Sequence, residues 1–304
     1  MSAALHYLAS AAEDATRLAA RLGVPAHEIK QHRFPDGELA VTVGPATATA
    51  ILYIPLDQPN EKLITILFAA EALRRGGCTR LVLLAPYLCY MRQDTAFHPG
   101  EAISQKAIGR FLASLVDRVI TVDAHLHRTA NLSDVFPGIA ADDLSAMPAI
   151  AAKLRRDPLD PGTIVVGPDA ESKQWVDALA KLIDRPSTVA RKIRRGDRSV
   201  VISFDNPSLI AGRPALLVDD IVSSGGTLIA CSKALHAAGA TFVDAVITHA
   251  LFPETRYREL AFAGLRSIRS THTVPHFTNS IVLDDLFVEA LASEIGTPSK
   301  ESRA

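Results

Sequence analysis

The sequence has little cysteine and no excess charge of either sign, and each shortage excludes a class of protein. Three cysteines, Cys78, Cys89 and Cys231, are too few and too widely spaced for a secreted disulfide framework or a CxxC zinc site. Lysine and arginine number 32 against 33 aspartates and glutamates, and a formal net charge of -1 creates no basic field for nucleic acid. We therefore expect a cytoplasmic protein without a nucleic-acid partner.

Long apolar runs are also missing. The longest, over 81–91, is interrupted by Pro86 and falls short of the roughly 20 residues that a membrane helix needs. The first ten residues lack the pattern of a signal peptide. With 48% hydrophobic and 21% charged residues, the composition is that of a soluble globular protein without a membrane partner.

Short β-branched runs alternate with helical patterns along the chain. The runs that predict strands, each apolar on both faces, are 51–55, 81–86, 119–122, 164–167, 216–218 and 243–248. The patterns that predict helices are 61–75, 104–115, 171–183 and 227–238. This alternation predicts the α/β class, with mainly parallel sheets flanked by helices, which bind ligands at the carboxyl ends of their strands.

A proline-rich stretch over 147–162 predicts the domain boundary. It contains Pro148, Pro158 and Pro161. A division there gives an N-terminal domain 1–147 and a C-terminal domain 148–304, each of about 150 residues, which is an ordinary domain size. Because both halves repeat the strand–helix rhythm, we expect a structural duplication.

The sharpest motif covers residues 215–227. Its apolar strand is expected to end in Asp219 and Asp220, a carboxylate pair suited to vicinal sugar hydroxyls. In the small-residue loop that follows, backbone N–H groups converge at the start of a helix, where the helix dipole adds positive charge. An ordinary strand–helix corner has no need of two adjacent carboxylates. We therefore predict a phosphate site formed by Ser223, Ser224, Gly225, Gly226 and Thr227.

Two common nucleotide-binding loops are absent, because neither GxxxxGK[ST] nor GxGxxG occurs. The segment 215–227 instead resembles the phosphoribosyl-diphosphate-binding loop of the phosphoribosyltransferase-like fold. Four further segments precede it: RFPDGE at 33–38, PYLCYMRQD at 86–94, VDAH at 122–125 and GPD at 167–169. Together the five segments resemble the ribose-phosphate pyrophosphokinase family, over a region from about Phe34 to Leu283.

The resemblance implies two phosphoribosyltransferase-like domains with the active site between them. The first domain would bind ATP and the second ribose 5-phosphate. Family members transfer the β,γ-diphosphoryl group of ATP to the C1 hydroxyl of ribose 5-phosphate and release AMP. Because several negative charges meet in that transition state, cations and positioning matter more than covalent catalysis. The resemblance implies Mg²⁺ as the cofactor.

Matches to the family also assign nucleotide and metal residues. Arg92, Gln93 and Asp94 match residues that bind ATP, and their side chains suit phosphates or the base. His125 and Asp169 each follow a predicted strand, and the resemblance gives them a shared Mg²⁺. On spacing alone, a solitary histidine would more often be structural.

Two further segments receive roles from the resemblance. Phe34, Asp36 and Glu38 match residues that hold adenine and belong to a neighbouring subunit, which implies a homo-oligomer; without the family, Pro35–Gly37 reads as a hairpin turn. Lys192 and Arg194 match residues of a mobile loop that, in the family, closes over the transferring group. They are the predicted catalytic residues. A basic run such as this one is otherwise a solvated surface.

The sequence also departs from the family pattern. The residues after Asp169 are Ala170, Glu171 and Ser172, where a glycine-rich turn is common, and Ser223 replaces a frequent aspartate. These changes indicate a divergent branch and leave alternatives open: a catalytically weak regulatory paralogue, or a diphosphokinase for another pentose phosphate. A base-specific phosphoribosyltransferase is disfavoured by the double-domain length and by the segment 92–94.

Overall fold

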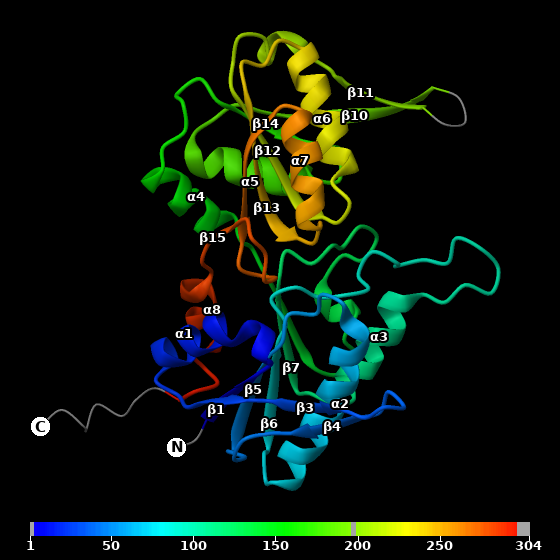
Figure 1. Cartoon of the computed structure of the whole chain (residues 1–304), viewed down its shortest axis with the longest axis vertical. Coiled ribbons are helices and arrows are strands. Elements are labelled where there is room, and N and C mark those ends of the chain that lie inside the picture. The colour runs from blue at the N-terminus through cyan, green and yellow to red at the C-terminus, as the bar shows by residue number, and fades with distance from the viewer. Residues whose placement is uncertain (1–2, 196–198, 297–304) are drawn as a thin grey trace, which may run out of the picture. The chain divides into compact units, whose positions relative to one another are not determined.

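The computed structural model describes the backbone of residues 3–195 and 199–296, and the side chains of these residues outside 192–201. The chain divides into two units (Figure 1). Of the described residues, 3–144 and 283–296 form the first unit, and those within 145–282 form the second. Within the described ranges, no helix is long and apolar enough to cross a membrane.

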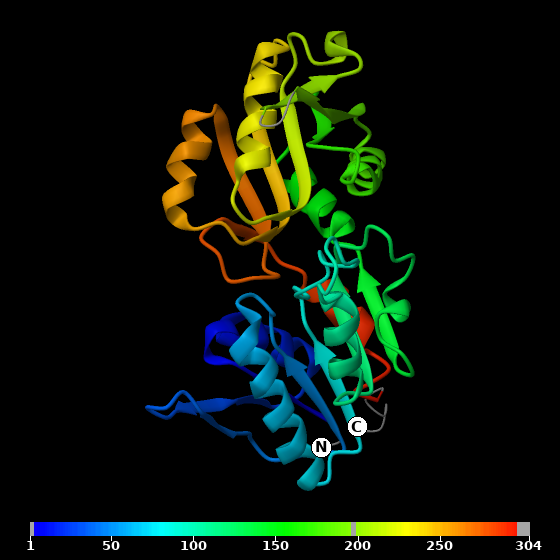
Figure 2. The same cartoon turned by 90° about the vertical axis from the view of Figure 1, so that its right-hand side faces the viewer.

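A six-stranded parallel sheet forms the centre of the first unit, in the order β2-β1-β5-β6-β7-β8. Its strands are β1 (Ala3–Tyr7), β2 (Ala26–Glu28), β5 (Thr49–Tyr53), β6 (Arg80–Leu84), β7 (Arg118–Val122) and β8 (Ala140–Leu144). Helices α2 (Pro59–Arg75) and α3 (Ser104–Ala113) cover one face, and α1 (Ala12–Leu22) and α8 (Asp284–Leu291) cover the other (Figure 2). The central strands β5 and β6 are buried almost throughout, as their two-sided apolar sequences predict.

A separate hairpin leaves this unit between β2 and β5. It consists of β3 (Lys30–Arg33) and β4 (Leu39–Thr42), which pair antiparallel. The turn closes through Gly37, whose N–H donates to the carbonyl of Phe34 at 2.9 Å and whose φ of +94° favours glycine. The turn reading of Pro35–Gly37 is therefore confirmed.

The second unit contains a seven-stranded sheet in the order β11-β10-β9-β12-β13-β14-β15, parallel except between β10 and β11. Its strands are β9 (Ile164–Gly167), β10 (Ser187–Arg195), β11 (Ser199–Phe204), β12 (Ala215–Val222), β13 (Val243–Ala250), β14 (Leu265–Thr271) and β15 (Asn279–Ile281). Helices α4 (Met147–Arg156) and α5 (Lys173–Ile183) cover one face, and α6 (Gly226–Ala237) and α7 (Glu254–Phe262) cover the other. The prediction of mainly parallel sheets between helices is confirmed for both units.

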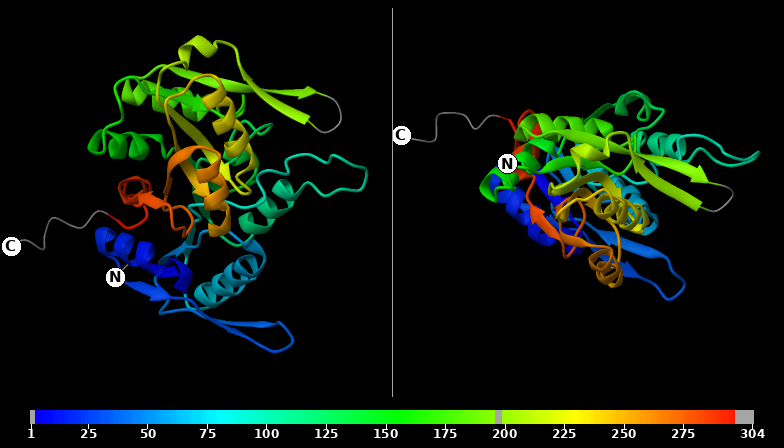
Figure 3. Two further views of the ribbon diagram at one scale, coloured as in Figure 1. Left: turned by 45° about the horizontal axis from the view of Figure 1, so that its top comes forward. Right: turned by 90° about the horizontal axis from the view of Figure 1, so that it is seen from above.

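The β10–β11 hairpin extends away from the body of the second unit (Figure 3). The backbones of Lys192 and Arg194 lie in β10, opposite Ile202 and Val200 of β11. Their side chains lie outside the described residues. Their predicted catalytic roles therefore stay predictions.

The structure divides the chain at 144/145 and again at 282/283, whereas the sequence predicted one division at 147/148. The second division exists because α8 packs in the first unit. Phe287 and Leu291 of α8 are buried, and Arg17 Nε of α1 donates to Asp284 Oδ2 at 2.7 Å. The C-terminal segment thus supports the first sheet.

Candidate active site

The paired carboxylates lie in the last half of β12. Pairing with β13 continues past them, from Asp219 opposite Ile247 to Val222 opposite Ala250, so the predicted end of the strand before the acids is wrong. Asp220 is 2% exposed, and its backbone N–H donates to Asp219 Oδ1 at 3.2 Å. Regular strand geometry therefore holds both carboxylates at this edge of the sheet, where a ligand would meet them.

Asp219 has a strongly perturbed titration. Burial raises the pKa of Asp219 well above its ordinary value, and the negative charges of Asp220 and Asp169 raise it further. The second unit thus brings the predicted metal residue Asp169 within electrostatic reach of the predicted sugar-binding pair. Such crowding of carboxylates favours a cation at this place.

The loop after β12 has the geometry of an anion site. Gly225 has φ +75° and stands directly before α6, whose first residue is Gly226. A Cβ on Gly225 would approach Leu260 Cδ2 to 3.3 Å, so α7 packs directly under the loop. Ser223 and Ser224 are exposed, and the first N–H groups of a helix have no partners within the helix. The predicted residues 223–227 therefore span this loop and the first two residues of α6.

Asp169 forms a tight turn between β9 and α5. Its Oδ1 accepts from the N–H groups of Glu171 at 3.1 Å and Ser172 at 3.3 Å, and Ser172 Oγ donates to its carbonyl at 2.7 Å. A Cβ on Gly167 would lie 2.2 Å from Ser172 Oγ, so the turn requires glycine there. The segment that departs from the family pattern is thus an ordered turn that orients Asp169.

In the first unit, His125 lies three residues after β7 and is half-buried. Its ring contacts that of His127, with centroids 3.9 Å apart and planes at 82°. The loop is held by β8, because Asp143 Oδ1 accepts from the N–H of Ala124 at 2.8 Å. His127, which the sequence analysis did not single out, is therefore a second imidazole at this strand end.

Gln93 connects the segment after β6 to the start of α3. Its Nε2 donates to Glu101 Oε1 at 2.7 Å, and its Oε1 accepts from Ser104 Oγ at 2.8 Å. The adjacent Arg92 is exposed. In the structure, Gln93 therefore links these two segments by hydrogen bonds, in addition to its predicted contact with ATP.

Asp94 is buried and pairs with Arg128. Its Oδ1 accepts from Arg128 Nη1 at 2.7 Å, and its Oδ2 accepts from the backbone N–H of Arg128 at 3.2 Å. The Arg128 side chain is 60% exposed and lies 5.9 Å from the centroid of Phe97. Sequence reasoning missed Arg128, because its contact with Asp94 joins residues that are 34 positions apart and leaves no local pattern. The pair ties the predicted segment 92–94 to the loop that follows β7.

The predicted adenine residues lie on the β3–β4 hairpin. Phe34 is 42% exposed, and the N–H of Glu38 donates to Asp36 Oδ1 at 3.1 Å. Between the hairpin and α2 lies a cavity of about 600 Å³. Its lining residues are Arg33, Gly37, Glu38, Leu39, Asn60, Glu61, Ile64 and Phe68. One predicted residue, Glu38, thus faces a cavity within its own unit.

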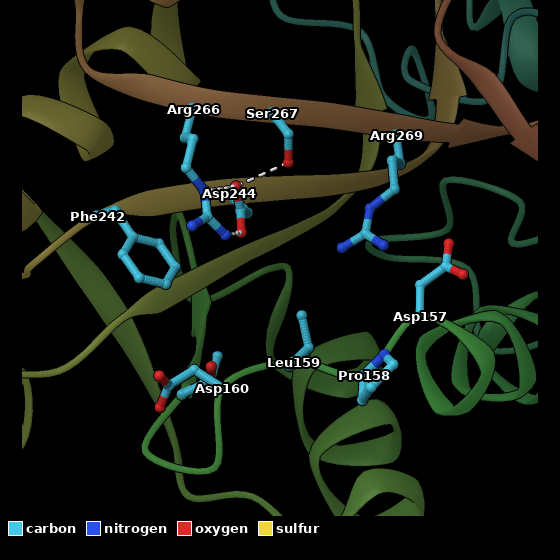
Figure 4. Close-up of a pocket in the computed structure, with 10 residues that line it drawn as sticks. Asp157, Pro158, Leu159, Asp160, Phe242, Asp244, Arg266, Ser267 and Arg269 are labelled. Atoms are coloured by element: carbon cyan, nitrogen blue, oxygen red, sulfur yellow. Dashed lines mark hydrogen bonds and ion pairs between the residues drawn. The ribbon is translucent and has the colours of Figure 1, made fainter.

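A cavity of about 410 Å³ lies at the amino ends of β13 and β14 in the second unit (Figure 4). Arg266 binds both carboxylate oxygens of Asp244 there, and its guanidinium lies 3.6 Å from the centroid of Phe242. None of the predicted site residues lines it. Because parallel sheets bind ligands at the carboxyl ends of strands, this cavity is separate from the candidate site.

Comparisons with known proteins agree with this fold. Residues 4–115 match the N-terminal domain of ribose phosphate pyrophosphokinase, and residues 144–276 match the phosphoribosyl transferase domain. The phosphoribosylpyrophosphate synthetase of Mycobacterium smegmatis has the same fold, with a TM-score of 0.84 at 23% identity over 97% of this chain and 100% of that chain. The fold and the loop thus define a two-domain protein of the phosphoribosyltransferase-like class.

Similarity to named relatives extends over nearly the whole chain. The ribose-phosphate pyrophosphokinase of Methanopyrus kandleri is 30% identical over 262 residues, which cover 86% of this chain and 88% of the relative. The enzyme of the same name from Halobacterium salinarum is 31% identical over 281 residues, which cover 91% and 96%. The chain belongs to the ribose-phosphate pyrophosphokinase family.

Proposed function

We propose that this protein transfers the β,γ-diphosphoryl group of ATP to the C1 hydroxyl of ribose 5-phosphate, in the cytoplasm, where its three buried cysteines stay reduced. The observation that carries the proposal is the carboxylate pair of β12 followed by a glycine loop that begins α6. A regulatory paralogue without activity is not favoured, because the relatives carry the name of an enzyme over almost the full chain.

The second unit binds the sugar phosphate in this proposal. Asp219 and Asp220 accept hydrogen bonds from the vicinal hydroxyls of ribose, and the loop 223–227 binds the 5-phosphate through its N–H groups and the start of α6. Ribose 5-phosphate carries vicinal hydroxyls and a phosphate on one sugar. The carboxylate pair of the strand matches the hydroxyls, and the anion-binding loop before the helix matches the phosphate.

The first unit binds ATP. Arg92 and Gln93 contact the phosphates or the base, and Asp94 acts with Arg128, whose exposed guanidinium is suited to phosphate oxygens. Phe34, Asp36 and Glu38 hold adenine from a neighbouring subunit, which requires a homo-oligomer. A sedimentation measurement that finds only monomers in the active protein would remove this assignment.

The carboxylates of the second unit suit Mg²⁺. Carboxylate oxygens are the ligands this ion prefers. Burial raises the pKa of Asp219 most, and the repulsion from Asp220 and Asp169 that raises it further is what a divalent cation would relieve. His125 and Asp169 are the residues proposed to hold it. When bound, Mg²⁺ would neutralise negative charge on the phosphates of ATP.

In the proposed reaction, the C1 oxygen forms a bond to the β-phosphorus of ATP, and its proton passes to solvent. The bond between the β-phosphorus and the oxygen bridging to the α-phosphate breaks, and AMP leaves. Asp219 and Asp220 orient the ribose ring so that C1 points at the β-phosphorus, and Lys192 and Arg194 supply charge to the transferring group.

An assay that identifies and quantifies both reaction products tests the proposal. Purified protein with ATP, ribose 5-phosphate and Mg²⁺ should form AMP and phosphoribosyl diphosphate in equal amounts. A panel of other pentose phosphates identifies a different acceptor. ADP in place of AMP, or no turnover with any acceptor, would contradict the proposal.

A further inference from the structure

Helix α7 begins beside the phosphate loop and is tied to it. The N–H of Leu251, the residue after β13, donates to the carbonyl of Val222, the last residue of β12, at 2.8 Å. The short connection 251–253 then leads into α7. The first turn of α7 is therefore held next to the residues that follow β12.

One face of α7 contacts two consecutive residues of the loop. Leu260 is fully buried and packs against Gly225. Arg256 precedes it by four residues and so lies on the same face of the helix. Arg256 Nε donates to the backbone carbonyl of Ser224 at 3.1 Å. The two side chains fix Ser224 and Gly225, which lead into the first N–H groups of α6.

The loop 223–227 has no positively charged side chain of its own to balance a bound phosphate. Residues 223–227 are uncharged, while Asp219 and Asp220 add negative charge beside them. A phosphate monoester brings further negative charge to the same place. Arg256 places a permanent positive charge at the edge of the loop. On the side that faces solvent, its Nη1 forms an ion pair with Glu259.

We infer that Arg256 is a positioning residue for the 5-phosphate: it fixes the Ser224 carbonyl, so that the loop's N–H groups converge, and it supplies positive charge at the loop's edge. The inference rests on the proposed function, because the phosphate belongs to ribose 5-phosphate. Glu259 moderates the effect by sharing the guanidinium. Arg256 acts mainly on substrate binding, since the reacting C1 lies at the other end of the sugar.

Steady-state kinetics of matched variants test the inference. Arg256→Gln should raise KM for ribose 5-phosphate about tenfold, the effect of one hydrogen bond from a charged group, with kcat and KM for ATP unchanged. Arg256→Lys keeps the charge and should restore part of the loss. Glu259→Gln frees the guanidinium and should lower KM for ribose 5-phosphate.

Arg258→Gln is the control, because Arg258 is exposed on the same helix and should leave every constant unchanged. The inference is overturned if Arg256→Gln leaves KM for ribose 5-phosphate unchanged, or if Arg256→Gln and Arg258→Gln raise it equally. A folded Arg256→Gln that lowers kcat alone would also overturn it. A wild-type protein without activity would instead overturn the proposed function itself, so the two failures are distinguishable.

Discussion

At the scale of single residues, Asp219 combines burial with like charge. Its pKa is raised by desolvation first and by Asp220 and Asp169 second. A carboxyl group whose pKa is raised in the folded state stabilises the fold only below its unfolded pKa, and this contribution is lost as the pH rises through the folded value. At a pH above this raised pKa, the ionised group therefore costs stability, which is typical of residues kept for binding.

Replacing this carboxylate should separate stability from activity. We expect Asp219→Asn to unfold at a higher temperature than the wild type at pH 8, with a difference that shrinks as the pH falls toward 4. The same variant should lose about tenfold to a hundredfold in kcat/KM, because it removes a charged hydrogen-bond acceptor for the sugar. Thermal unfolding across pH and steady-state kinetics measure both effects.

Asp177→Asn is the matched control, since Asp177 is exposed and pairs with Lys173 on the surface of α5. It should show neither the gain in stability nor the loss of activity. A destabilised Asp219→Asn at pH 8 would contradict the electrostatic account of the cluster.

The pair of Asp94 and Arg128 yields a second prediction at this scale. Arg128→Ala should lower the free energy of unfolding by about 1–2 kcal/mol, because it leaves a buried carboxylate without its guanidinium, while the exposure of Arg128 limits the loss. It should also raise KM for ATP. A double-mutant cycle with Asp94→Asn measures the coupling. Additive effects of the two changes on stability would contradict the pairing.

At the scale of elements, the β10–β11 hairpin carries the predicted catalytic pair. In phosphoryl transfer, an arginine that stabilises the transition state gives about 10³–10⁵ in rate. We expect Lys192→Ala to lower kcat by a comparable order, with no change in the unfolding temperature. Arg191→Ala is the control within the same strand, because Arg191 pairs with Asp205 on an exposed surface. Near-wild-type turnover of Lys192→Ala would remove Lys192 from the mechanism.

Most elements could be predicted from the sequence because their signals are local. The strand 164–167 and the start of the helix at Ser104 were predicted to the residue, and β5 and β6 were shifted by one or two residues. The strand around Asp219 was predicted too short because carboxylates normally end an apolar run, whereas pairing with β13 carries β12 four residues further, to Val222. Tertiary pairing here overrides local preference.

The candidate site was predicted less completely. The loop 223–227 was recognisable because glycines and small residues before a helix have one strong physical reading. Arg128 was missed and His127 was left out because it lies off the motif; their importance depends on contacts with Asp94 and His125 that spacing does not reveal. Arg256, 32 residues from Ser224, was likewise invisible before the fold was known.

At the scale of the whole molecule, the chain returns to its first unit after completing the second. Glu294 Oε1 accepts from Arg80 Nη2 at 2.7 Å and from Arg118 Nη1 at 3.1 Å, which ties the C-terminal segment to β6 and β7. These contacts join residues more than 170 positions apart in the sequence. No local pattern predicts them, and a boundary based on prolines could not assign 283–296 to the first unit.

This connection predicts an acid-sensitive contribution to stability. Hydrogen bonds from Arg80 and then Arg118 lower the pKa of Glu294, so its contribution is present above the ordinary carboxyl pKa and lost as the pH falls through the lowered value. We expect Glu294→Gln to lose about 1–2 kcal/mol at pH 7 and to match the wild type at low pH. Denaturant unfolding at several pH values measures this. A constant difference at all pH values would contradict the ion-pair account.

The central claim is that one reaction moves two phosphoryl groups together. Parallel reactions with ATP labelled at the α-phosphate and at the γ-phosphate test it most directly. We predict that all the α-label leaves in AMP and all the γ-label appears in phosphoribosyl diphosphate, in equal amounts. The α-label in ADP together with the γ-label in a doubly monophosphorylated ribose would contradict the account.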